Sequence, residues 1–412
     1  MSDRLCDSSA LLSPLTELFQ QRLSAEMATQ VTDFAGHYYQ TATHEELSER
    51  SLDNLYGATL SCWQFLQGFE SAQPKLRLYN PDLEQHGWRA QHTVIEIVQA
   101  DMPFLVDSVR MALNRHGLVI HTIHNAILYT RRDDKGGLLS LGDKSDTDTT
   151  PESVIYLEVD RTSDDTELKE LHDNLIKVLS HVRMAVDDYP AMQSRAETML
   201  AELSQQGGQD DICDFLRWML ADHFTFLGYD EIRIEGDQVV SVEGSELGIF
   251  KLDPKTIAGS NLAALRDAER EFLLEPSPLM FAKDARYSLV HRPAYIDRIV
   301  LKQFDDEGNV IGKIRFHGLY TSAVYSQPMS VIPVIRDKAN AVLERRLART
   351  GLITTRGFRD VLELGRRTRP QPYGMTGRFV PVIPRDLRLE VAERMEASGR
   401  VREALDEAGV RA

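Results

Sequence analysis

A tight strand–helix–strand pattern between residues 93 and 129 constrains the fold of this chain more than any other feature. The apolar run at 93–99 predicts a buried strand, and Asp101 with Pro103 predicts a helix start, because Asp caps free amides and Pro fits the first turn. Gly117 is placed to end this helix before a second strand at 118–129. Four apolar residues share one helix face: Leu105, Val109, Ala112 and Leu113. Such a helix must pack on the face of a sheet.

The following segments extend the same unit. Residues 131–153 are polar and without periodicity, which predicts a long exposed loop. A third strand is predicted from Val154 to Asp160, and apolar residues at three- and four-residue spacing predict a helix from about Thr166 to Asp188, ended by Pro190. The order strand, helix, strand, strand, helix predicts an α+β layer.

A second α+β pattern occupies residues 191–350. It begins with helix broken at Gly207-Gly208, followed by strands at 224–234 and 239–242 and a helical piece near 260–272. Two alternating runs flank the turn residues 305–309, which predicts a long β-hairpin. A helix from about Val331 to Arg349 is expected to close this unit.

The predicted organisation has four parts. Residues 10–72 show helical spacing, and Pro74 with Asn80-Pro81 marks a break. Residues after 350 contain 12 Arg, no Lys and nine acidic residues, with prolines interrupting any pattern. We therefore expect a helical segment, two α+β domains and a poorly ordered Arg/Pro-rich tail, at residues 1–80, 81–190, 191–350 and 351–412.

Charge and composition exclude several classes of partner. The formal net charge of −16 argues against nucleic acid and against anionic membrane surfaces, which both require basic residues. No signal peptide is evident, and no apolar run approaches the roughly 18 residues of a spanning helix. The three cysteines are isolated, so neither a disulfide framework nor a zinc site is indicated. We expect a cytoplasmic protein.

Common cofactor and catalytic motifs are missing from the sequence. It contains no G-x-G-x-x-G dinucleotide fingerprint, no phosphate-binding P-loop and no G-x-S-x-G nucleophile elbow. His116, His121 and His124 are close in sequence, but residues three apart in a strand point to opposite faces, so we expect no metal site. We also expect the segment 291–295 (HRPAY) to form a turn into the hairpin.

One candidate ligand site is the turn before the first α/β helix. Backbone amides at a helix N-terminus can hold a carboxylate, so a small amino acid could dock at the turn Asp101, Met102, Pro103, Phe104 and Leu105. On geometry alone, a capped helix start without any ligand is the favoured interpretation of the same residues.

This unit resembles an ACT domain, a small βαββαβ module that typically binds amino acids and regulates metabolic enzymes. The Asp101-Met102-Pro103 sequence matches the Asp-x-Pro of the ACT ligand loop. The sequence departs from the ACT pattern in two respects: Phe104 stands where a glycine is usual, and no fourth strand is evident beyond Pro190. The resemblance implies a ligand held by the amides of 101–105, with Asn114 assisting from the helix.

A more specific resemblance covers most of residues 1–350. The segments DMPFLVDSVRMALNRHG, ADHFTFLGYDEIRI, SLVHRPAYIDRIVLKQFDDEGNVIGKIRFHGLYTSA and PVIRDKANAVLER are similar to the amino-terminal part of the large bacterial NAD-specific glutamate dehydrogenases. Those enzymes oxidise L-glutamate to 2-oxoglutarate and ammonium with NAD, and their dehydrogenase module comes much later in the chain. The resemblance implies a regulatory or assembly part of a homo-oligomeric enzyme, inactive alone and without bound NAD.

Two alternatives remain open: a freestanding amino-acid-binding sensor or interaction module, and an independently active enzyme. The similarity ends after about Leu352, where the composition becomes rich in Arg and free of Lys. A truncated gene, or translation of the tail from about Thr354 in a shifted frame, would explain this change.

Overall fold

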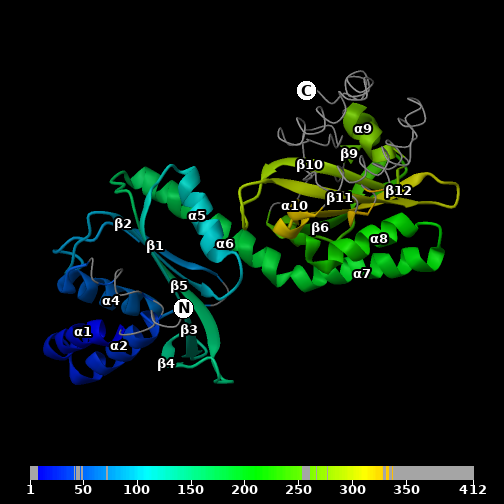
Figure 1. Ribbon diagram of the computed structural model, residues 1–412. Coiled ribbons are helices and arrows are strands. Elements are labelled where there is room, and N and C mark those ends of the chain that lie inside the picture. The colour runs from blue at the N-terminus through cyan, green and yellow to red at the C-terminus, as the bar shows by residue number, and fades with distance from the viewer. Residues whose placement is uncertain are drawn as a thin grey trace, which may run out of the picture. The chain divides into compact units, whose positions relative to one another are not determined.

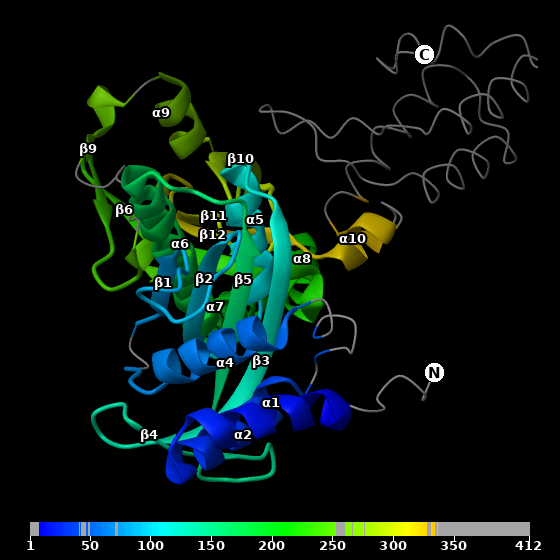
Figure 2. The ribbon, with the colours of Figure 1, turned by 90° about the vertical axis from the view of Figure 1, so that its left-hand side faces the viewer.

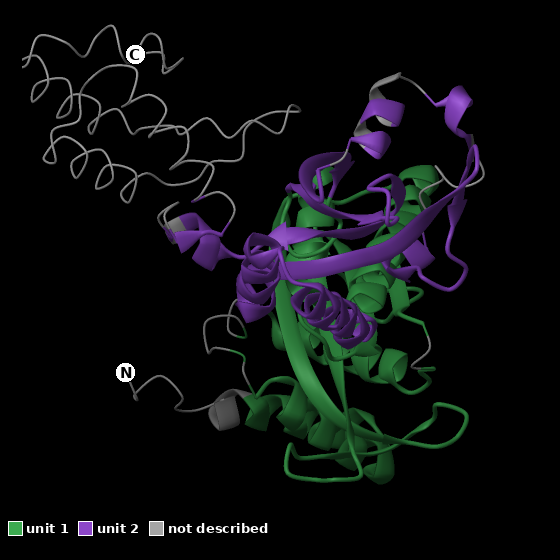
Figure 3. Cartoon of the chain, turned by 90° about the vertical axis from the view of Figure 1, so that its right-hand side faces the viewer, with its two compact units in different colours: residues 1–186, 288–293 green, residues 187–287, 294–412 purple. Residues whose placement is uncertain are grey.

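A computed structural model describes most of the chain up to residue 336: 8–40, 42, 47, 50–70, 73–252, 260–265, 267–275, 277–327, 331–333 and 336. The chain divides into two compact units (Figure 3), namely unit 1 (residues 1–186 and 288–293) and unit 2 (residues 187–287 and 294–412). The predicted α+β class is confirmed, because each unit combines helices with an antiparallel sheet. The Arg/Pro-rich tail and most of the helix expected at 331–349 lie outside the described residues.

In the described part of residues 10–72, unit 1 contains three helices, as the spacing there predicts. They are α1 (Ser8–Arg22), α2 (Ala25–Tyr38) and α4 (Leu52–Leu66). Serine hydroxyls cap two of them: Ser24 accepts a hydrogen bond from the amide of Met27, and Ser51 accepts one from the amide of Asn54. Each cap satisfies one of the amides that a helix start leaves without a partner.

The sheet of unit 1 has the strand order β1-β2-β5-β3-β4, with antiparallel pairing throughout. Its elements are β1 (Lys75–Tyr79), β2 (Thr93–Ala100), α5 (Leu105–Arg115), β3 (Ile120–Arg132), β4 (Leu138–Gly142), β5 (Thr150–Val159) and α6 (Asp165–Asp187). Helices α1, α2 and α4 cover one face, and α5 and α6 cover the other (Figures 1 and 2). Strands β2 and β5 lie between two helical layers, so most of their residues are buried.

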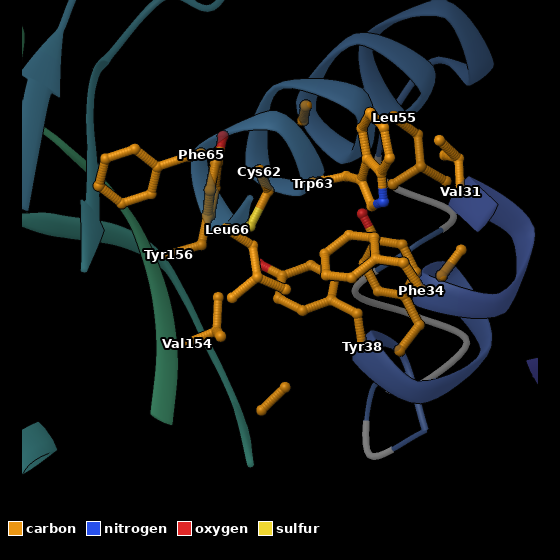
Figure 4. Close-up of a cluster of buried hydrophobic side chains, with 14 of the residues drawn as sticks. Val31, Phe34, Tyr38, Leu55, Cys62, Trp63, Phe65, Leu66, Val154 and Tyr156 are labelled. Atoms are coloured by element: carbon orange, nitrogen blue, oxygen red, sulfur yellow. The ribbon is translucent and has the colours of Figure 1, made fainter. Parts of the chain in front are cut away.

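Aromatic side chains fill the space between the first three helices and the sheet (Figure 4). Phe34 and Tyr38 from α2 and Leu66 from α4 meet Val154 and Tyr156 from β5, and all five are buried. Each large apolar side chain removed from water contributes roughly 1.5–3 kcal/mol. This cluster therefore attaches the three N-terminal helices to the sheet.

Strand β1 occupies the edge of the sheet next to β2, and within the described residues no strand lies directly beyond Pro190, where the ACT pattern has its fourth strand. No strand follows α6, because the helix α7 (Tyr189–Gln206) begins directly after it, with Pro190 in its first turn. Instead β1, which precedes the module, pairs antiparallel with β2 at the sheet edge. Strand β1 was not predicted, because Pro74 and Asn80-Pro81 were interpreted as a break and the five residues of β1 lie between them.

The prediction of a long exposed loop at residues 131–153 is wrong. Strand β3 continues to Arg132, β4 occupies Leu138–Gly142 and β5 begins at Thr150. Asp133 Oδ1 accepts hydrogen bonds from the amides of Lys135 and Gly137, both at 2.8 Å, and so closes a tight hairpin turn. The segment therefore forms a hairpin through hydrogen bonds from backbone amides to an Asp side chain, and it needs no periodic apolar pattern.

Unit 2 starts with helical segments that break where Gly207-Gly208 predicts. They are α7, α8 (Asp210–Trp218) and a π-turn, η1 (Met219–His223). The strands β6 (Phe224–Glu235) and β7 (Gln238–Ser241) follow as expected, then β8 (Leu247–Gly248), η2 (Ile249–Lys251), β9 (Ser260–Asn261), η3 (Leu262–Ala264), α9 (Asp267–Leu274), β10 (Leu279–Tyr287), β11 (Tyr295–Phe304), β12 (Val310–Tyr320) and α10 (Ser322–Ser326). The helix near 260–272 is shorter than predicted, and β10 was not predicted.

The predicted hairpin is confirmed as β11 and β12. Asp305 Oδ1 accepts hydrogen bonds from the amides of Glu307 and Asn309, and Gly308 takes the positive φ of 84° that the turn requires. The sheet has the order β10-β11-β12-β6-β7-β9, with β8 paired to β6. One sheet face packs on α7 and α8 through an apolar cluster that includes Phe226, Ile299 and Phe316. Within the described residues, no helix is long and apolar enough to cross a membrane.

Candidate functional site

Hydrogen bonds to β5 order the turn from β2 to α5, and the helix α5 does not begin with the Asp101 cap that the sequence predicted. Asp101 does not cap the helix: its Oδ1 accepts a 2.6 Å hydrogen bond from Ser153 Oγ, and its amide donates to the carbonyl of Pro151. The N-cap is Phe104, which makes no side-chain capping bond. Asp101 thus fixes the turn to β5, and the first amides of α5 receive no side-chain cap from the turn.

Phe104 adopts a backbone conformation that glycine usually occupies. Its φ is 74°, in the left-handed region that non-glycine residues rarely enter. The other predicted residues of the turn are placed as follows: Met102 Sδ accepts a 3.4 Å bond from Gln99, Pro103 is exposed and Leu105 is buried in the core. A ligand at this turn would meet the Phe104 ring where the resembling domains have only a hydrogen atom.

Asn114 lies apart from the turn with which it was expected to act. It is in the last turn of α5, nine residues beyond Leu105, which corresponds to about 13 Å along a helix axis. The structure does not bring the two parts of the predicted site together. Instead Asn114 lines a separate pocket of about 310 Å³, hereafter the α5 pocket, with Asp107, Arg110, Met111, Arg115, His291 and Pro293.

One wall of the α5 pocket is the segment 288–293, which belongs to unit 1. Two hydrogen bonds hold this segment on α5: Arg115 Nη2 donates to the carbonyl of Ser288, and the amide of His291 donates to Ser108 Oγ, both at 2.9 Å. Strand β11 begins at Tyr295, so the predicted turn into the hairpin is confirmed. The position of His291 in the lining of a pocket was not predicted.

Charges of both signs surround the α5 pocket. Asp107 and Arg110 are exposed on α5, and Asp107 Oδ2 lies 3.8 Å from Nδ1 of His291. That nitrogen is buried and has no hydrogen-bond partner among the described residues. Residues 107, 110 and 114 share one helix face, so the polar stripe was visible in the sequence, although its partner segment was not.

A second pocket lies between the helices and the sheet of unit 1. Its lining includes Tyr38, Tyr39, Arg50, His124 and Tyr156, and its volume is about 30 Å³. That volume suits one ordered water molecule rather than a metabolite.

The three nearby histidines occupy separate environments. His116 caps the end of α5, His121 Nε2 lies 2.8 Å from Asp160 Oδ1 and His124 Nε2 lies 2.7 Å from the carbonyl of Tyr38. His121 also stacks on His92 at 4.0 Å. The described residues contain no group of three or more side chains suited to a metal ion.

Unit 2 buries charged groups on the sheet face away from α7 and α8. Arg315 from β12 forms a bidentate pair with Asp230 from β6, and both side chains are almost wholly inaccessible to solvent. Burial, with a further contribution from Arg315, lowers the pKa of neighbouring Lys313 to about 7. This layer was not predicted, although Lys313, Arg315 and His317 alternate strictly with Ile314 and Phe316 in the sequence.

Most of the chain is similar to proteins of known family. Residues 34–175 match the family model "Glutamate dehydrogenase, ACT1 domain". The NAD-specific glutamate dehydrogenase of Halomonas elongata is 42% identical over 347 residues, which are 81% of this chain and 22% of that protein. The enzyme of the same name from Pseudomonas aeruginosa is 40% identical, over 79% of this chain and 21% of that protein. The Mycobacterium tuberculosis enzyme is 25% identical over 60% of the chain and 15% of its own length.

The C-terminal part of the chain matches a different family model. Residues 338–412 match the model "Hydantoinase/oxoprolinase N-terminal region". A tail translated in a shifted frame would not be expected to match a protein family, so this finding counts against the shifted-frame hypothesis.

The chain spans about a fifth of the length of the curated relatives that it matches. The resemblance inferred from the motifs is therefore confirmed: this chain is homologous to the N-terminal region of the large NAD-specific glutamate dehydrogenases and carries their ACT1 domain.

Proposed function

We propose that this chain is a regulatory and assembly part of an NAD-dependent glutamate dehydrogenase system and holds no catalytic module. The full-length enzymes convert L-glutamate, NAD and water to 2-oxoglutarate, ammonium and NADH. The observation that carries the proposal is the coverage: relatives match 81% of this chain but devote only 22% of their length to the match. About four fifths of such an enzyme thus lies outside the matched region.

The described residues do not fit NAD. Dinucleotides bind at the carboxyl ends of parallel strands, beside a glycine-rich turn that lets the backbone approach the pyrophosphate. The strand pairs of both sheets described here are antiparallel. The turn from β2 to α5 presents the Phe104 ring instead of a glycine. We therefore expect NAD to bind elsewhere in the enzyme system.

Spectrophotometry of the purified chain tests this proposal directly. With L-glutamate and NAD present, we expect no NADH formation above the rate of a buffer control. Calorimetric titration with NAD should likewise give no binding heat. Sustained NADH formation, abolished by heating the protein, would show that the chain is an independent enzyme and would overturn the proposal.

The regulatory part of the proposal concerns an amino-acid effector and self-association. ACT-type domains typically respond to amino acids, so an effector is expected to stabilise the folded chain by about 2.7 kcal/mol at a hundredfold excess over Kd. The amides of 101–105 are one possible receptor for its carboxylate, although the Phe104 ring narrows the space there. Light scattering tests homo-oligomer formation, and a strictly monomeric chain would contradict the assembly role.

A second candidate function is a freestanding amino-acid sensor or interaction module. The match of residues 338–412 to a different family favours it, because that part of the chain is similar to a domain other than the ACT1 domain. Coexpression with a full-length relative discriminates the two cases. Copurification with altered glutamate oxidation supports the enzyme part, and amino-acid binding without association supports the sensor.

A further inference from the structure

The α5 pocket adjoins two residues with unusual backbone conformations. Among the residues that the structure describes, three non-glycine residues have positive φ, and two of them, Phe104 and His291, have ring centroids 4.9 Å apart. Both belong to unit 1. Backbone strain of this kind persists only where surrounding contacts enforce it, and it concentrates at ligand sites and switches.

Fixed contacts enforce this geometry. The amide of His291 donates to Ser108 Oγ, and Ser108 is fully buried in α5. Arg115 Nη2 holds the carbonyl of Ser288 at the other end of the segment. The wall of the pocket is therefore preorganised against a helix, and a ligand would not have to order it.

The lining offers three kinds of group in a small space. Asp107 supplies a carboxylate, Arg110 supplies a guanidinium and Asn114 supplies an amide, all on one face of α5. Met111 and Pro293 contribute apolar surface between them. The volume of about 310 Å³ lies at the lower end of the range of about 300–1,000 Å³ for ligand pockets, so the ligand must be small.

These groups discriminate between ligand classes. A simple anion would face repulsion from Asp107, and a simple cation would face repulsion from Arg110. A molecule with an ammonium and a carboxylate a few bonds apart meets a partner of opposite charge at each end. Charge-assisted hydrogen bonds of this type are about twice as strong as neutral ones.

We propose that the α5 pocket, rather than the turn at 101–105, binds a free α-amino acid, with its ammonium at Asp107 and its carboxylate at Arg110 and Asn114. The side chain of the amino acid lies over Met111 and Pro293. Because the ligand contacts His291, its binding stabilises the segment 288–293 on α5. This inference rests on the proposed effector-responsive function and gives that function a different site.

Calorimetric titration of the whole chain tests the inference, with the twenty standard L-amino acids as probes. At least one is expected to bind, and its N-acetyl and carboxamide derivatives, which each lack one charge, are expected to bind at least tenfold more weakly. Asp107→Asn and Arg110→Gln should each weaken binding about tenfold or more. Both residues are exposed, so the variants are expected to keep the fold of the parent chain.

Matched controls lie on α6, where Glu170 and Lys169 are exposed and outside the pocket. Glu170→Gln and Lys169→Gln change the same charges and should leave Kd unchanged. Peptide-resolved hydrogen exchange adds a second readout, since the bound amino acid should slow exchange in 288–293.

The outcomes separate this inference from the proposed function. Binding that the two pocket variants leave unchanged overturns the α5 site while the regulatory role stands. Binding by none of the twenty amino acids overturns both the site and the sensor. Binding that only the pocket variants weaken, with protection of 288–293, supports the site whatever the NADH assay shows.

Discussion

One buried ion pair in each unit shows two different arrangements of its partners. In unit 1, Glu96 is almost wholly inaccessible, but its partner Arg77 keeps 35% of its side chain exposed at the sheet edge. In unit 2, Arg315 and its partner Asp230 are 0% and 5% exposed. When the buried partner of a half-exposed pair is removed, water still solvates the remaining charge, so the cost in folding free energy is low. When one partner of a fully buried pair is removed, the remaining charge has neither water nor a partner, so the cost is high.

The difference extends to pH. Burial raises the pKa of Glu96 against the opposing effect of Arg77, and burial lowers the pKa of Lys313 to about 7. The raised pKa of Glu96 favours folding at acidic pH, and this contribution is lost as pH rises through that pKa. The lowered pKa of Lys313 favours folding above about pH 10.5, and this contribution is lost as pH falls through about 7. The contributions of these two groups to stability should therefore respond to pH in opposite directions.

The largest expected effect comes from breaking the pair in unit 2. Asp230→Ala leaves the guanidinium of Arg315 buried without its bidentate partner, which should lower the free energy of unfolding of unit 2 by about 3–5 kcal/mol. Peptide-resolved hydrogen exchange in β6 and β12 measures this loss separately from unit 1. A loss below about 1 kcal/mol would mean that removing one partner of a buried ion pair costs as little in unit 2 as in unit 1.

The next effect has the opposite sign. Lys313→Met replaces a buried ammonium with an apolar chain of similar length and should stabilise unit 2 by about 1–4 kcal/mol at pH 6. The gain should shrink as pH rises from about 7 towards 10.5, because the wild-type folded state then sheds its proton while the unfolded state keeps it. Denaturation of both proteins at several pH values measures the difference, and a gain independent of pH would contradict the assigned cause.

The sequence predicted elements that rest on local periodicity and missed those that rest on partners distant in the chain. The α5 helix, the α6 helix and the β11–β12 hairpin carry regular apolar spacing and turn residues, so they were predicted. Strand β1 is short, and its signal depends on its neighbour β2 rather than on its own five residues. The hairpin at 133–137 is built by side-chain bonds from Asp133, which leave no period in the sequence.

The candidate site shows the same limit. Motif matching found the turn at 101–105 and Asn114, but placed them together because both belong to one helical unit. Helix rise alone would have separated Asn114 from Leu105. No local pattern brings His291 to α5, since that contact joins segments far apart in the chain.

A smaller effect, of opposite sign, is expected from the matching change in unit 1. Glu96→Gln replaces a carboxylate whose pKa is raised by burial, and Arg77 remains partly hydrated, so the free energy of unfolding should rise slightly at pH 7 rather than fall. The difference between variant and wild type should shrink at acidic pH, where Glu96 is itself protonated. Hydrogen exchange in β2 reports the change, and a loss as large as that of Asp230→Ala would remove the contrast between the units.

The smallest effect should come from a pair that is exposed on both sides. Asp214 and Arg217 lie one turn apart on α8, at 2.8 Å, with about half of each side chain open to water. Water and salt already screen this pair, so Asp214→Ala should cost no more than about 0.5 kcal/mol and should lose even that in high salt. Urea denaturation at low and high ionic strength measures both quantities. Because this pair lies in the same unit as Asp230 and Arg315, a loss of several kcal/mol here would mean that unit 2 is sensitive to any change of charge, and burial would no longer explain the difference between the two units.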